Sequence, residues 1–164
     1  MTLYDILVLV HIVSILVFVA AHAVSAAAMF QVRSEADPGR LAAILARSSQ
    51  SLSIALLAVI VSLIAGIVLG IMGSHFGRLW IWASLILLVG VGGAMTPMAA
   101  IPMSNVRRAL GIQVGKLKEG EAPASPQGDA AVAAARAALR PEVVALLGVA
   151  AVVIITWLMY TKPF

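Results

Sequence analysis

The residues of this sequence with the most potential for chemistry are two histidines in one long apolar stretch. His11 and His22 lie within residues 3–29, which are long enough to cross a bilayer at a rise of about 1.5 Å per residue. Because ionisable groups are costly in hydrocarbon, an intramembrane histidine is a candidate functional residue. The chain has no cysteine, which excludes disulfides, thiolate metal sites, iron–sulfur clusters and thiol nucleophiles.

The spacing of these histidines limits what they can bind together. In one continuous helix His11 and His22 point to the same face, offset by about 20°, and lie roughly 16 Å apart. One metal ion or haem iron cannot bind both, since its ligands approach to about 2 Å. The remaining histidine, His75, lies in a predicted loop. A bis-histidine haem would therefore need His11 from a symmetric second chain.

Methionines supply the other candidate ligands. Met95 and Met98 are expected near the depth of His22, and an imidazole with thioethers suits Cu(I) or a haem with His/Met ligation. The alternative, which we favour, is that these methionines fill gaps in a bundle rich in alanine and glycine.

For His11 the alternative to a cofactor or proton-relay role is a neutral imidazole that is hydrogen-bonded across helices. Such contacts stabilise helix association by roughly 0.6 kcal/mol each, and we favour this interpretation. The hydroxyl residues expected near His11 are Ser14, Ser62, Ser84 and Thr156.

The composition predicts an all-α membrane protein, an antiparallel four-transmembrane-helix bundle in a single domain over residues 1–164. Hydrophobic residues make up 62% of the chain and charged residues 11%, and the mean hydropathy is +1.08. A soluble domain has roughly 25% charged residues. The predicted spans are about 3–29, 52–72, 79–98 and 143–160.

Local signals predict where helices begin and break. Thr2 and Asp5 have capping-box spacing, and Asp37 before Pro38 predicts a second helix start. Pro97 and Pro102 should kink or end the third helix. Residues 105–140 are predicted to form a cytoplasmic loop with a short, alanine-rich amphipathic helix.

Glycines in the spans predict close helix packing. Gly66 and Gly70 form a GxxxG pattern in the second span. Gly90 and Gly93 leave one side of the third span without side chains. We expect these positions to mediate packing within the bundle, in a homo-oligomer or in a larger membrane complex.

The basic residues predict orientation and lipid contact. They concentrate in the connections between the first and second and between the third and fourth spans. Under the positive-inside rule both termini lie on the non-cytoplasmic side of the cell inner (plasma) membrane. No basic stripe alternates with aromatics, so we expect the lipid bilayer and anionic headgroups as partners, with no nucleic acid. The basic residues of these connections are Arg33, Arg40, Arg47, Arg107, Arg108, Lys116, Lys118, Arg136 and Arg140.

Several motifs together resemble a known family. They are VHIVSILVFVAAH near the N-terminus, the R-x-E-x-D-P turn, AGIVLGIMGSHFG at the end of the second span and LWIWASLILLVGVGGAM in the third. This pattern, over the chain up to about Gly115, resembles the DUF2269 four-span membrane proteins, which are similar to CopD-like copper-resistance membrane proteins. The resemblance implies a link to copper or haem, and His11 is the residue of this chain that it matches to a family position.

We expect a small non-enzymatic integral membrane protein, an accessory or self-associating helical bundle without a cofactor. The sequence has no paired carboxylates, phosphate-binding glycine loop or nucleophile motif. One alternative is a redox or metal-handling protein that binds haem b or copper through His11, or through His22 with Met95 and Met98. A third, weaker hypothesis is a proton or small-solute carrier.

Overall fold

The described part of the chain forms a bundle of four long apolar helical rods, as predicted, and each rod is long and apolar enough to cross a membrane. The structure, a computed structural model, describes residues 1–116 and 124–163. Lys118 and the rest of segment 117–123 of the predicted loop lie outside the described residues. The helices are α1 (Leu3–Ser34), α2 (Pro38–Met72), the 3₁₀ helix η1 (His75–Gly77), α3 (Leu79–Met95), the π-helical η2 (Thr96–Ala100), α4 (Ile101–Ala109), α5 (Asp129–Ala137) and α6 (Pro141–Thr161).

The first two helices begin where their capping residues predict. The Thr2 backbone N–H donates to the Asp5 carboxylate at 2.8 Å, and the Asp5 N–H donates to the Thr2 hydroxyl at 3.2 Å. The Asp37 carboxylate accepts from the Arg40 N–H at 2.7 Å, with Pro38 in the first helical position. Both caps satisfy amides that a helix start leaves without partners.

The third rod differs from its predicted bounds. Instead of ending near residue 98, it continues through η2 and α4 to Ala109. Pro97 and Pro102 remove backbone donors, and the wider π turn between α3 and α4 accommodates this loss without ending the rod. The segment predicted as a loop from residue 105 therefore begins with helix. Within it, the short alanine-rich helix α5 spans Asp129–Ala137.

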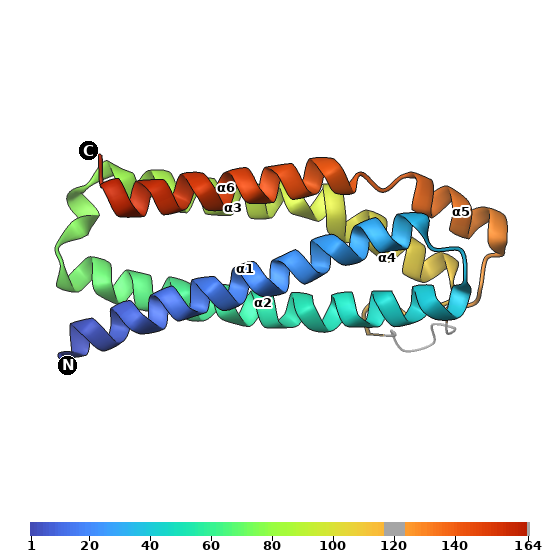
Figure 1. Cartoon of the computed structure of the whole chain (residues 1–164), viewed down its shortest axis with the longest axis horizontal. Helices are drawn as coiled ribbons and strands as arrows, with labels where there is room; N and C mark the ends of the chain where they lie inside the picture. Colours follow the sequence, from blue (N-terminus) through green and yellow to red (C-terminus); the bar gives the residue numbers. More distant parts are fainter. Residues whose placement is uncertain (117–123, 164) are drawn as a thin grey trace.

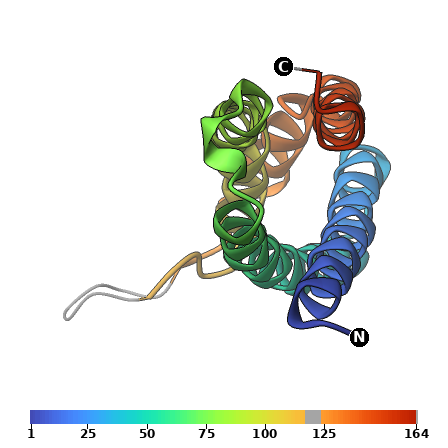
Figure 2. The same cartoon turned by 90° about the vertical axis from the view of Figure 1, so that its left-hand side faces the viewer.

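The rods are arranged as two antiparallel pairs, α1 with α2 and α3 with α6 (Figure 1). We call the end with both termini and η1 the terminal end, and the end with α4 and α5 the basic end. The pairs lie close together at the basic end and separate toward the terminal end. The view along the rods shows them as a ring (Figure 2).

The largest buried core lies at the basic end, where α1, α2, α4 and α6 meet. Its buried side chains come from segments far apart in the sequence, and they are Met29, Val32, Leu41, Leu45, Met103, Val106, Leu139 and Val144. A smaller cluster of Trp80, Ile81 and Leu158 joins α3 to α6 near the terminal end. Elsewhere the rods expose large apolar side chains, such as Leu57 and Leu146, as helices in lipid do.

Candidate functional site

His11 lies between α1 and α2, where it forms a hydrogen bond to the neighbouring helix. Its Nδ1–H donates to the backbone carbonyl of Ser62 at 2.8 Å, and the Ser62 hydroxyl lies 3.2 Å from the same nitrogen. Of the hydroxyl residues expected near His11, Ser62 is the one that meets it. The predicted cross-helix hydrogen bond is therefore present.

The acceptor determines the tautomer of His11. Because a carbonyl oxygen only accepts, Nδ1 carries the proton, and in the neutral ring the lone pair is on Nε2. Histidines that bind metals are commonly oriented in this way, with the second nitrogen donating to a carbonyl or carboxylate. The same hydrogen bond thus serves packing and also leaves one nitrogen able to act as a ligand.

Gly66 makes room for the His11 ring. A Cβ at Gly66 would lie 3.0 Å from Cε1 of His11 and 3.3 Å from Nδ1. Gly70, one turn further along α2, has a similar relation to Phe76, whose ring would lie 2.8 Å from an added Cβ. Both glycines of the GxxxG pattern therefore receive rings from this same chain.

His22 lies against the other helix pair. Its ring stacks on Phe18 with the ring centroids 5.7 Å apart. A Cβ at Gly148 of α6 would lie 3.0 Å from Nε2 of His22 and 3.5 Å from Cε of Met95. The structure therefore brings the side chains of His22 and Met95 near one another between α1, α3 and α6.

Met98, the third residue of this predicted ligand set, packs against the buried core at the basic end, as Met95 also does. His11 faces α2, and His22 faces α3 and α6, so the structure places the histidines in separate surroundings. Within residues 1–116 and 124–163, no three side chains of His, Cys, Asp or Glu come together. An ion beside His22 would therefore rely on imidazole and thioether ligands.

Gly90 and Gly93 of α3 are exposed, and no described residue of another helix lies close to either position. A Cβ at either position would meet no atom within 4 Å. If these glycines mediate packing, as the sequence predicts, their partner lies outside residues 1–116 and 124–163 of this chain.

Arginines at the basic end join the helices, a role that the sequence interpretation missed. Arg107 of α4 donates to the Leu45 carbonyl at 3.1 Å and to the Ser49 hydroxyl at 2.9 Å, both on α2. Arg136 of α5 donates to the Val32 and Arg33 carbonyls at 3.0 and 3.1 Å, at the C-terminus of α1. From the sequence, both arginines were interpreted only as orientation signals. Their hydrogen-bond acceptors are backbone carbonyls and a serine hydroxyl on other helices, which carry no charge. No charge pattern marks such partners.

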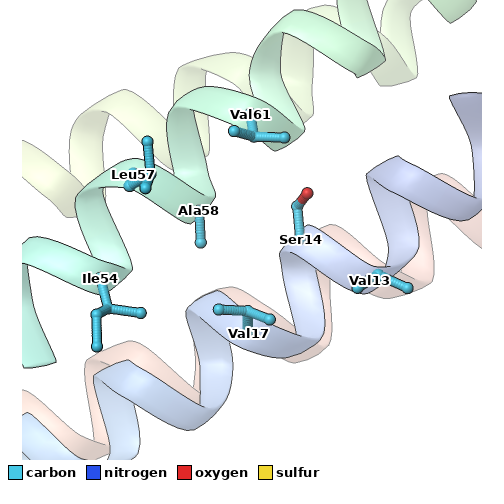
Figure 3. Close-up of a pocket in the computed structure, with 7 residues that line it drawn as sticks. All are labelled: Val13, Ser14, Val17, Ile54, Leu57, Ala58 and Val61. Carbon is cyan, nitrogen blue, oxygen red and sulfur yellow. The ribbon is translucent and has the colours of Figure 1, made fainter.

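A groove of about 210 Å³ runs between α1 and α2 (Figure 3). The Ser14 hydroxyl donates to the Val10 carbonyl at 2.7 Å, so it is already satisfied within its own helix. All other lining side chains are apolar. The groove is lined by Val13, Ser14, Val17, Ile54, Leu57, Ala58 and Val61.

Comparison with known protein families gives a match over nearly the whole chain. The family described as "Predicted integral membrane protein (DUF2269)" matches residues 5–163. No curated protein and no solved structure matches the chain.

Proposed function

The chain belongs to the DUF2269 family of predicted integral membrane proteins, and we propose that it is a non-enzymatic accessory bundle that associates with itself. In this role it contributes packing surfaces within the membrane, and the hydrogen bonds of His11 and the serines hold α1 to α2. Ser25 and Ser51 support this role, since each donates across that helix pair to a backbone carbonyl, of Ser48 and Ala21 respectively.

The observation that carries the proposal is the open glycine face of α3. Gly90 and Gly93 are three residues apart and therefore lie on neighbouring positions of one helix face, with open space around both. Helices in lipid associate through small residues, because lipid and apolar side chains offer no hydrophobic drive. A second copy of α3 could approach closely at this face.

The test is the oligomeric state of the purified chain in mild detergent, measured by light scattering coupled to size-exclusion chromatography. We expect a dimer or larger homo-oligomer for the native chain, and a shift toward monomer for Gly90→Leu/Gly93→Leu. Gly77→Leu is the control, because Gly77 is also exposed but lies in η1. A native chain that is monomeric at all concentrations would contradict the proposal.

A second candidate function is haem or copper binding. It is favoured by the approach of His22 and Met95 to one point beside Gly148, and by the orientation of His11, whose Nδ1 bonds to the Ser62 carbonyl and leaves Nε2 for a ligand. These donors fit a His/Met-ligated haem or a soft copper ion, which would supply redox chemistry when bound. His11 would hold its ligand separately, with the Ser62 carbonyl orienting the ring.

An absorption spectrum and metal analysis of the purified protein separate the two functions. A Soret band or stoichiometric copper that His22→Ala or Met95→Ala removes would favour the second function. Loss of the same signal in His11→Ala would instead assign the haem or copper to His11. Absence of both signals after expression with added haem precursor and copper would favour the packing role.

For the orientation, we infer that the basic end faces the cytoplasm and that both termini lie outside it, in the plasma membrane. The positive-inside rule supports this, since Arg78 and Lys162 are the basic residues of the terminal end, while the other nine Lys and Arg belong to the predicted cytoplasmic connections. A C-terminal alkaline phosphatase fusion should be active and the matching fluorescent-protein fusion dark. The reverse result would invert the topology.

A further inference from the structure

We propose that the groove between α1 and α2 holds one acyl chain of an anionic phospholipid whose headgroup binds Arg47. The occupant would be a lipid of the leaflet at the basic end. The argument depends on the direction the groove faces, on the position of Arg47 and on the depth of both in the membrane.

The groove faces away from the bundle interior. Val13 lies about 160° around α1 from His11 by helical periodicity, and Val17 lies about 140° from His22. Because the histidines face α2 and the α3–α6 pair, the groove side of α1 faces the surrounding lipid. Consistent with this, the Val17 and Ile54 side chains are 41% and 52% exposed. Figure 3 shows them projecting into the space between the two helices.

Arg47 continues the groove toward the basic end. It precedes Ile54 by seven residues on α2, so the two side chains lie on one face within about 20° and about 10 Å apart along the axis. Arg47 is exposed. Among residues 1–116 and 124–163 the ion pairs are Arg33–Glu142 and Arg40–Glu35, so within this part of the chain no carboxylate neutralises Arg47.

The depth of Arg47 suits a phosphate. From Arg47 to Gly70, where α2 meets the ring of Phe76, α2 rises about 35 Å, slightly more than the hydrocarbon thickness of about 30 Å. With Gly70 near one membrane boundary, Arg47 lies at the headgroup level of the other. The groove begins at Ile54, within hydrocarbon, which is the position of an acyl chain below its headgroup. A basic side chain at this level attracts anionic lipid.

Native mass spectrometry of the full chain in detergent tests this proposal. The probe is an equal mixture of phosphatidylglycerol and phosphatidylcholine with the same acyl chains. We expect the first bound lipid to be mainly phosphatidylglycerol. Arg47→Gln should lower the ratio of phosphatidylglycerol to phosphatidylcholine in that first adduct about fivefold. Arg140→Gln removes an exposed arginine from the same end, directly before α6, which does not line the groove, and should leave the ratio unchanged.

A second variant tests the acyl-chain part of the proposal. Val17→Phe fills the groove from its α1 side and should reduce the first adduct of both lipids. Ile54→Phe fills the groove from its α2 side and replaces Val17→Phe in this experiment if that variant does not fold. Equal binding of the two lipids by the native chain, or an unchanged ratio in Arg47→Gln, would overturn the proposal. Full lipid binding by the groove-filled variants would do so as well.

Discussion

His11 is bonded to the backbone of α2 and only secondarily to a side chain. The carbonyl of Ser62 accepts its N–H at 2.8 Å, whereas the Ser62 hydroxyl is 3.2 Å away. A backbone acceptor persists whatever residue occupies position 62. The contact therefore depends on the histidine and on the closeness of the helices more than on the serine.

This geometry predicts unequal effects of two substitutions. Ser62→Ala should lower the free energy of unfolding by less than about 0.6 kcal/mol, and His11→Ala by more, up to about 1.7 kcal/mol. Unfolding in mixed micelles of increasing dodecyl sulfate fraction measures both losses. Equal losses would mean that the hydroxyl is the principal acceptor.

The glycines of α2 and α3 are predicted to differ sharply in their tolerance of a side chain. Gly66→Leu forces atoms into the space of the His11 ring, so we expect it to destabilise the chain by about 1–3 kcal/mol. Gly92→Leu, whose Cβ would meet nothing within 4 Å, is the matched control and should be nearly neutral. Thermal unfolding in detergent compares the two. Similar melting temperatures would contradict the close contact at Gly66.

At the scale of elements, α5 caps the C-terminal end of α1 through Arg136. The last four carbonyls of a helix find no N–H donor within the helix. A guanidinium can bind them well, because it is charged and offers several donors. Arg136 fills this role for Val32 and Arg33, while Arg33 itself pairs with Glu142 of α6 at 2.7 Å. Together these contacts tie α1, α5 and α6 at the basic end.

Arg136→Ala should loosen this end without disturbing the spans. Loss of two hydrogen bonds from a charged donor is expected to cost about 1.5–3 kcal/mol. Hydrogen exchange should therefore accelerate in α5 and in the last turns of α1. Arg140→Ala, which removes an exposed arginine nearby in sequence, should leave both regions protected. Equal exchange in the two variants would show that Arg136 does not anchor α5.

At the scale of the whole molecule, the buried large apolar side chains gather mainly at the basic end, while α1 and α2 pack along their length through small residues such as Ala21, Ala55 and Ala58. Water drives the burial of apolar surface, and lipid does not. The core around Leu41 and Val106, both 0% exposed, lies at the basic end, where we expect the rods to leave the hydrocarbon. Toward the terminal end the pairs separate, and lipid or another chain can cover their apolar sides.

Leucine truncations should reveal this division. Leu41→Ala leaves a cavity in the buried core and should destabilise the chain by about 2–5 kcal/mol. Leu146→Ala changes a side chain that is 71% exposed on α6 and should cost less than about 1 kcal/mol, since lipid fills the vacated space. Chemical unfolding in detergent measures both. A large loss for Leu146→Ala would indicate that another chain covers α6.

Much of the fold followed from local physics that the sequence carries. The long apolar stretches require helices, because backbone groups in lipid must be satisfied within their own segment. The caps at Thr2 and Asp37 mark helix starts with short-range hydrogen bonds, so they were predicted correctly. The third rod was predicted too short, since the effect of Pro97 and Pro102 depends on whether neighbours support a π turn.

The candidate site, like the fold, was predictable from the sequence only in part. Sequence alone determined that His11 and His22 share one face of α1 at a fixed separation, because helical rise and periodicity are properties of the local backbone. Only the tertiary structure decided that His11 meets Ser62, that His22 meets Met95 beside Gly148, and that Gly90 and Gly93 are open. Which helix faces a residue depends on how the rods cross, and that is set by packing among side chains distant in sequence.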